Sequence, residues 1–119
     1  MTTLASTMVI LVAMLHLYFL VLEMFFWEKP LGLRTFGLKP EFAKASKSLA
    51  ANQGLYNGFL AAGLIWGLTL GENGNAIKIF FLLCIIIAGI FGALTASRKI
   101  LYVQALPAII ALLLTGLSI

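Results

Sequence analysis

The 119-residue sequence is poor in charged and metal-binding side chains. It contains no aspartate, one histidine (His16) and one cysteine (Cys84), and charged residues make up 10% of the chain. A lone cysteine cannot form a disulfide within the chain, and it provides no zinc-type ligand spacing; no c-type haem attachment motif occurs either. These absences exclude a disulfide-stabilised domain and a metal site built from several cysteines.

What the sequence has in excess is apolar residues. Hydrophobic residues make up 62% of it, and the mean hydropathy is +1.09. A soluble domain has about one quarter charged residues, and long apolar runs indicate transmembrane helices of about 20 residues each. Alternation with a period of two residues is absent, and only helices or closed barrels satisfy the backbone in hydrocarbon. We therefore expect an all-α polytopic membrane protein, an antiparallel bundle of four transmembrane helices.

The expected helices belong to one transmembrane domain that covers residues 1–119. The stretches "GENGN" and "SRK" are short enough for tight turns, so sequential helices run antiparallel. No basic residue precedes the first apolar stretch, which disfavours a cleaved signal peptide. The four spans are expected at about residues 4–27, 49–70, 76–96 and 101–117.

The segment 28–48 differs from the other connections in length and charge. Pro30, Gly32 and Gly37 predict an irregular first half. Pro40 occupies a position that favours the start of a helix, with Glu41 in the first turn. We expect this helix to start outside the membrane and to run without interruption into the second span.

The basic residues predict the orientation in the membrane. Segment 28–48 and the turn 97–100 together contain seven of the eight Lys and Arg residues, and Lys78 is the exception. The positive-inside rule places both loops in the cytoplasm and both termini outside. The net charge of +4 follows from this bias and favours anionic lipid, so we expect the lipid bilayer as a partner and no nucleic acid.

Polar side chains within the spans are the candidate site. His16 and Glu23 are seven residues apart and so lie on nearly the same face of the first helix. Ionisable residues in membrane segments generally face the bundle interior and mark functional sites. We expect one buried polar layer in the cytoplasmic half of the bundle, with His16 somewhat deeper. The expected ligand-binding residues are His16, Glu23, Asn52, Gln53, Tyr56, Asn57 and Gln104.

Most of these residues also have a purely structural explanation. Asn52 and Asn57 would form hydrogen bonds between helices, and Glu23 would pair with a loop cation. His16 would be a neutral imidazole bonded to an amide of the second helix. Gln104 would repair a carbonyl group that a kink at Pro107 leaves without a donor.

Small residues recur every fourth position in the second span. One row contains Ala50, Gly54, Gly58 and Ala62, and Gly63 begins a second row. Such rows allow helices to approach closely. We therefore expect the second helix to be central and one row to serve a second protomer, so that the protein forms a homo-oligomer.

Three blocks resemble a known family. These are "HLYFLVLEMFFWE", "FGLKPEFAKASKSLAANQGLYNGFLAAGLIWG" and "ALPAIIAL", of which "LAANQGLYNGFLAAGL" is the most specific. They are similar to the bacterial DUF1304 family of small membrane proteins. The resemblance implies a four-helix protein of the bacterial cytoplasmic (inner) membrane and assigns no activity.

Three function classes follow. We favour a module that binds or transports a small polar or amphipathic ligand at the polar layer. The second class is an intramembrane enzyme, similar in size and helix count to haem-dependent isomerases that open epoxides, with His16 as a haem ligand or base and Glu23 as an acid. The third class is an accessory subunit in which the polar layer only holds helices together. Haem is thus a possible cofactor only in the second class, and the residues predict no metal site built from several ligands.

Overall fold

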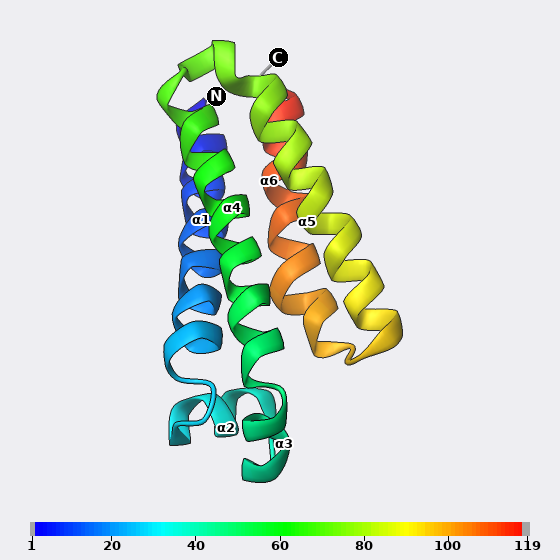
Figure 1. The fold of residues 1–119 in the computed structure, drawn as a ribbon. Coiled ribbons are helices and arrows are strands. Elements are labelled where there is room, and N and C mark those ends of the chain that lie inside the picture. Colours follow the sequence, from blue (N-terminus) through cyan, green and yellow to red (C-terminus); the bar gives the residue numbers. More distant parts are fainter. Residues whose placement is uncertain (1, 118–119) are drawn as a thin grey trace. The chain divides into compact units, whose positions relative to one another are not determined.

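The computed structural model describes residues 2–117 and is all-α, with no strand in that range (Figure 1). This confirms the expected all-helical class. The elements are α1 (Thr2–Phe25), α2 (Pro30–Phe36), α3 (Pro40–Ala45), α4 (Lys47–Thr69), the 3-10 helix η1 (Gly71–Gly74), α5 (Asn75–Thr95), the π-helix η2 (Leu101–Ala105) and α6 (Leu106–Leu117).

The chain forms two compact units. One, called here the terminal unit, consists of Met1–Met14 and Leu60–Ile119; the other, the middle unit, consists of Leu15–Phe59. The helices α1 and α4 each contribute residues to both units.

Two helical stretches are long and apolar enough to cross a membrane, Thr3–Phe25 and Gly71–Thr95. Helix α4 has 23 residues, but polar side chains lower its hydropathy. The apolar stretch Leu101–Leu117 is shorter, about 26 Å at 1.5 Å per residue, against a hydrocarbon core of about 30 Å. The helices begin and end close to the bounds of the expected segments. Two of the four expected spans are long and apolar enough to cross a membrane.

In the terminal unit, α5 packs against η2 and α6, and the two helices lie side by side (Figure 1). A Cβ atom at Gly89 would lie 2.8 Å from the Cβ atom of Ala105, so the absence of a side chain permits this approach. Gly63 of α4 lies against the ring of Phe81 of α5. The largest wholly buried apolar side chains of this unit are Val9, Val12, Leu64, Leu82 and Ile85.

The helix end near Pro107 contains a π-helical turn. The backbone N–H of Leu106 bonds to the carbonyl oxygen of Leu101, five residues earlier. Proline has no N–H to donate to the carbonyl group four residues before it, so a local change in hydrogen-bond spacing is expected there. The helix irregularity that the sequence predicts at Gln104 and Pro107 is therefore the π-helical turn η2.

The first half of segment 28–48 is helical, so the prediction of an irregular segment was wrong. Pro30 occupies the first turn of α2, where its missing N–H is tolerated. Gly32 is buried, and a Cβ atom there would collide with the carbonyl oxygen of Phe26. Gly37 ends the helix with a φ of 64°. Gly32 therefore allows a close backbone approach and Gly37 ends the helix, and neither keeps the chain irregular.

The uninterrupted helix from Pro40 into the second span was also wrong, because the helix breaks at Ser46. Helix α3 ends at Ala45, and Ser46 has φ −100° and ψ 7°. The Ser46 hydroxyl accepts a hydrogen bond of 3.1 Å from Trp27 Nε1 and donates one of 2.7 Å to the carbonyl oxygen of Phe42. Sequence patterns could not show the break, since the partner that holds it, Trp27, lies just beyond the end of α1 and is distant in the sequence.

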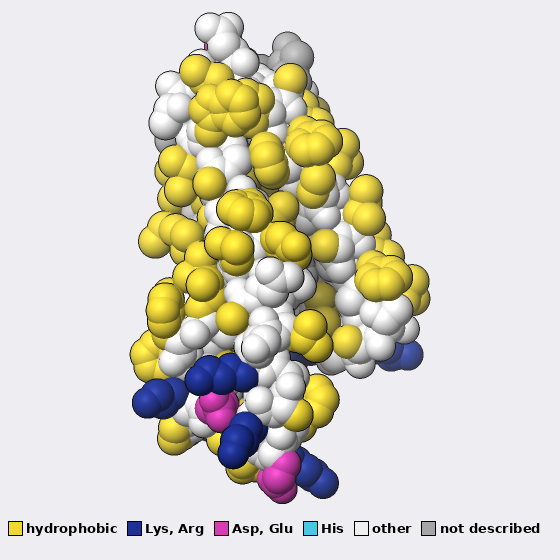
Figure 2. All heavy atoms as spheres, viewed as in Figure 1, with side chains coloured by type: hydrophobic (Ala, Val, Ile, Leu, Met, Phe, Trp, Pro, Cys, Tyr) yellow, Lys and Arg dark blue, Asp and Glu magenta, His cyan; other side chains and the backbone are white. Residues whose placement is uncertain are grey.

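Charged side chains gather over the α2–α3 segment (Figure 2). An ion pair of 3.3 Å joins Lys47 to Glu28, and the ring of Trp27 lies 5.1 Å from that of Phe36. Both partners of the ion pair are well exposed, so the pair adds little stability. The tryptophan contacts therefore do more than the ion pair to hold this segment to the helix ends.

Candidate functional site

The buried positions of α1 and α4 follow a spacing of four and three residues in turn. On α1 the row contains Ala5, Val9, Val12, His16 and Glu23, and all of these are buried except Glu23, which is half-buried. On α4 the row contains Ala50, Gly54, Asn57, Ala61 and Leu64, all of them buried. This spacing keeps residues on one face of a helix, whereas a strict spacing of four drifts away by about 40° per step. His16, Glu23 and Asn57 are the polar members of these two rows.

Glu23 and Asn57 are brought together within the middle unit. The amide Nδ2 of Asn57 donates a hydrogen bond of 2.6 Å to Oε1 of Glu23. Asn57 is 5% exposed and Glu23 is half-buried. Sequence reasoning named both residues, and they form the one pair of predicted site residues that an identified hydrogen bond joins within residues 15–59.

Glycine makes this pairing possible. A Cβ atom at Gly54 would lie 2.7 Å from Met24 Cγ, 3.1 Å from Glu23 Cβ and 3.2 Å from the carbonyl oxygen of Leu20. One turn later, a Cβ atom at Gly58 would lie 2.7 Å from a methyl carbon of Leu20. The two helix backbones therefore approach closely around Asn57, which lets its short side chain reach the carboxyl group of Glu23.

Glu23 has unused hydrogen-bonding capacity. A carboxylate accepts through two oxygen atoms, and Asn57 is its single hydrogen-bond partner among residues 2–117. A half-buried carboxyl group with one amide donor can accept a further hydrogen bond from a ligand. Among the described residues, no group of three or more His, Cys, Asp or Glu side chains that could hold a metal ion occurs.

His16 is wholly buried and packs edge-on against the ring of Phe19, with centroids 5.5 Å apart and an interplanar angle of 76°. Seven residues separate it from Glu23, which is about 10 Å along the helix axis. A haem iron at His16 needs open space beside the imidazole, which has no exposed surface. The described residues therefore do not fit a haem there without repacking.

Asn52, Gln53 and Tyr56 are exposed on α4, so they do not join the buried layer that the sequence predicted. Tyr56 is 51% exposed, and its ring lies 6.0 Å from that of Phe59. Asn52 and Tyr56 are about 140° and 100° from Asn57 around the helix, and Gln53 lies at the edge of the buried row. Their role in ligand binding remains a prediction.

Gln104 is half-buried in η2, within the terminal unit. Its role in a ligand site likewise stays a prediction. Sequence reasoning missed two residues whose placement is informative, Ser46 and Lys78. Ser46 carries no sequence signal, whereas Lys78 is the lone charged residue of the apolar stretch "AIKIFFLLC" and is buried, with 7% of its surface exposed.

Comparison with known proteins is consistent with this description. A family profile described as "Protein of unknown function (DUF1304)" matches residues 10–115. The chain is 34% identical over 115 residues to the "Uncharacterized protein YpaA" of Lactococcus lactis subsp. lactis (strain IL1403), which covers 95% of this chain and 97% of that protein. No solved structure gives a significant match.

Proposed function

The chain belongs to the DUF1304 family, and from this premise we propose that it is a small multi-pass membrane protein that binds a ligand at the Glu23–Asn57 pair. The ligand is a small polar or amphipathic molecule with a hydrogen-bond donor. The donor reaches the carboxyl group of Glu23 from the lipid or from the cytoplasm. Transport of the same ligand would use the same contact.

The observation that carries this proposal is that the Glu23 carboxyl group, on an apolar helix, accepts a single hydrogen bond, from the amide of Asn57. Glu23 lies within the apolar stretch Thr3–Phe25, and a carboxyl group in such surroundings is costly unless several hydrogen bonds satisfy it. Asn57 supplies one donor, and residues 2–117 supply no second one. A ligand donor would complete the set.

The proposed topology has four spans, with α4 and the η2–α6 stretch crossing in addition to the two longest apolar helices. The charge distribution supports it, since segment 28–48 and the turn 97–100 contain most of the basic residues. In this arrangement both termini lie outside the bacterial inner membrane. Gly54 and Gly58 already pack against α1 within the chain, so the proposed homo-oligomer would use other surfaces.

A structural role is the second candidate, because the same hydrogen bond joins α1 to α4. Hydrogen bonds between membrane helices contribute on average about 0.6 kcal/mol each. In this role the Glu23–Asn57 pair would matter for stability alone. The two candidates therefore differ in what Glu23→Gln does, since glutamine still accepts the bond from Asn57 but lacks the charge.

Native mass spectrometry of the gently extracted full chain tests the proposal. We expect a small molecule bound to the wild-type protein, and its occupancy to fall several-fold in Glu23→Gln. Glu41→Gln, a change at an exposed acid of α3, is the matched control and should keep the wild-type occupancy. Equal occupancy in Glu23→Gln and wild type, or no bound molecule in either, would contradict ligand binding and leave the structural role. The same spectra report the number of subunits.

A further inference from the structure

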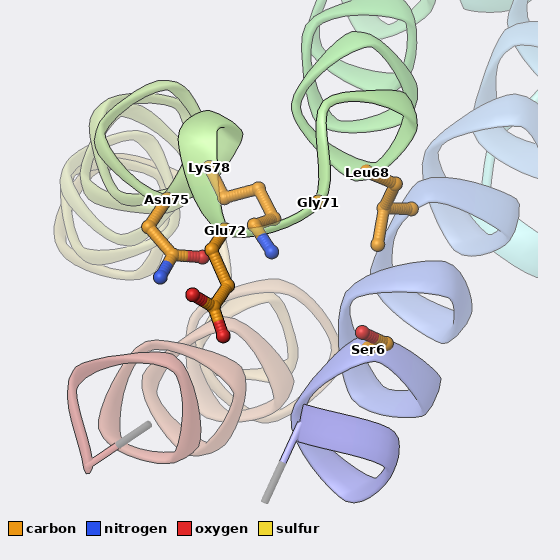
Figure 3. Close-up of a pocket in the computed structure, with 6 residues that line it drawn as sticks. All are labelled: Ser6, Leu68, Gly71, Glu72, Asn75 and Lys78. Carbon is orange, nitrogen blue, oxygen red and sulfur yellow. The ribbon is translucent and has the colours of Figure 1, made fainter. Parts of the chain in front are cut away.

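The terminal unit contains a second polar site, at the end where α4 passes through η1 into α5. A pocket of about 290 Å³ is lined by Ser6, Leu68, Gly71, Glu72, Asn75 and Lys78 (Figure 3). These residues come from α1, the end of α4, η1 and the start of α5. None of them belongs to the Glu23–Asn57 pair, so this site is independent of the function proposed above.

Lys78 is the buried cation of this pocket. Its residue is 7% exposed, and its amino group points into the space beside Gly71 and Leu68 (Figure 3). Gly67 accommodates the aliphatic stem, because a Cβ atom there would lie 2.6 Å from Lys78 Cγ. The absence of a side chain at Gly67 thus allows the stem to lie against α4 while the amino group reaches the pocket.

The Lys78 amino group forms no ion pair or hydrogen bond within residues 2–117. The aliphatic stem of Lys78 is buried and its amino group borders the pocket, so an anion that enters the pocket can reach it. Lys78 lies in the first turn of α5, where the helix dipole is positive, and this also favours an anion. The pocket therefore favours an anionic group next to Lys78.

Glu72 decides which kind of anion fits. It is exposed, it lines the same pocket, and its carboxyl group points away from Lys78 (Figure 3). A bare dianion would be repelled by this carboxylate, whereas a molecule with separate negative and positive groups would meet a partner at each end. Asn75 and Ser6 also line the pocket and can form neutral hydrogen bonds.

We infer that this pocket binds a phosphate–ammonium zwitterion with the chemistry of phosphoethanolamine. The phosphate contacts Lys78, and the ammonium group contacts Glu72. The volume suits a small group, since it lies near the lower limit of about 300 Å³ for small-molecule pockets. The zwitterion is either a soluble molecule or the headgroup of a phospholipid that lies beside the helix ends.

Two binding measurements on the detergent-solubilised full chain distinguish the sources. Titration calorimetry with soluble O-phosphoethanolamine tests the free molecule. Native mass spectrometry after release from nanodiscs tests the lipid, with phosphatidylethanolamine compared with phosphatidylcholine, whose ammonium group is methylated and donates no hydrogen bond. Binding in the first measurement assigns the site to a soluble ligand, and selective retention of phosphatidylethanolamine assigns it to the lipid headgroup.

The variants identify the pocket residues. Lys78→Met keeps an unbranched stem against Gly67 and should reduce affinity about tenfold or more, as expected for loss of a charge-assisted hydrogen bond. Glu72→Gln should weaken phosphoethanolamine binding and strengthen binding of inorganic phosphate, because it removes the repelling carboxylate. The controls are Lys99→Met and Glu41→Gln, both at exposed positions, which should bind as the wild type does.

A role of Lys78 in helix packing alone predicts a different result. In that case Lys78→Met and wild type would bind both probes equally, or neither protein would bind either probe, and the inference would be overturned. Glu72 is exposed, so the Glu72→Gln variant is expected to fold. It keeps the inference testable even if the Lys78→Met variant is unstable. An unchanged preference between phosphoethanolamine and inorganic phosphate in Glu72→Gln would also overturn it.

Discussion

The amide of Asn57 on α4 donates a hydrogen bond of 2.6 Å to the carboxyl group of Glu23 on α1. Both residues lie on rows of their helices whose other members, apart from His16, are apolar or glycine. The close approach at Gly54 sets the distance between them. The pair thus combines a packing contact with a carboxyl group that has capacity for a further hydrogen bond.

Removal of the amide should destabilise the fold. In Asn57→Leu the Glu23 carboxyl group loses its donor, and we expect a loss of about 1–3 kcal/mol in the free energy of unfolding. Unfolding of the detergent-solubilised protein by denaturant measures this. Asn52→Leu, at an exposed position of the same helix, should leave the stability unchanged. A double variant with Glu23→Leu should lose less than the sum of the single changes, and strict additivity would argue against the bond.

Glycine at position 54 should be sensitive to a single methyl group. Gly54→Ala places a Cβ atom 2.7 Å from Met24 Cγ, and overpacking of this kind costs about 1–3 kcal/mol. Gly116→Ala is the matched control, because nothing lies within 4 Å of its Cβ position. That change should instead stabilise α6 by about 0.5–1 kcal/mol. Melting temperatures in one detergent compare the two, and equal shifts would contradict the close approach.

Ser46 should matter more than its neighbour Ser48. Ser46→Ala removes the acceptor of the Trp27 indole N–H, and we expect a loss of about 0.5–1.5 kcal/mol. In a Trp66→Phe background, quenching of Trp27 fluorescence by iodide reports whether the ring becomes more accessible. The control is Ser48→Ala, which changes an exposed serine. Identical quenching in both variants would mean that the hydrogen bond does not hold Trp27.

Replacement of Thr115 by valine should increase the stability of the protein. Its hydroxyl oxygen is buried without a hydrogen-bond partner among the described residues, and Thr115 is 1% exposed. Thr115→Val removes this unsatisfied group and should raise the stability by about 1 kcal/mol. In Thr95→Val the lost hydroxyl is exposed and bonded to the carbonyl oxygen of Phe91, so no gain is expected. A melting temperature that falls in Thr115→Val would contradict this account.

The four-span topology can be tested by labelling. In a Cys84→Ala background, single cysteines at Lys39, Asn73 and Ser97 replace exposed residues. A membrane-impermeant maleimide applied to intact cells should label position 73 only. After permeabilisation, positions 39 and 97 should also react. Reaction of all three from the same side would rule out four crossings.

Much of the fold could be predicted because hydropathy and turn residues act locally. The long helices begin and end within a few residues of the expected positions, since apolar runs and the stretches "GENGN" and "SRK" define them. Glu23 and Asn57 could also be singled out, because an acid and an amide in apolar helices need partners. Local patterns did less well between residues 28 and 48, where Trp27 and Ser46 meet across 19 positions.

The sequence by itself determined that the chain is helical and apolar and that its apolar segments contain few polar side chains. Tertiary structure alone decided which of them meet. Asn52, Gln53, Tyr56 and Asn57 lie within six residues of one another, yet Asn57 alone of the four is buried. The reason is that a helix turns by about 100° per residue, so burial depends on where the neighbouring backbone comes closest, and the contacts of Gly54 set that position.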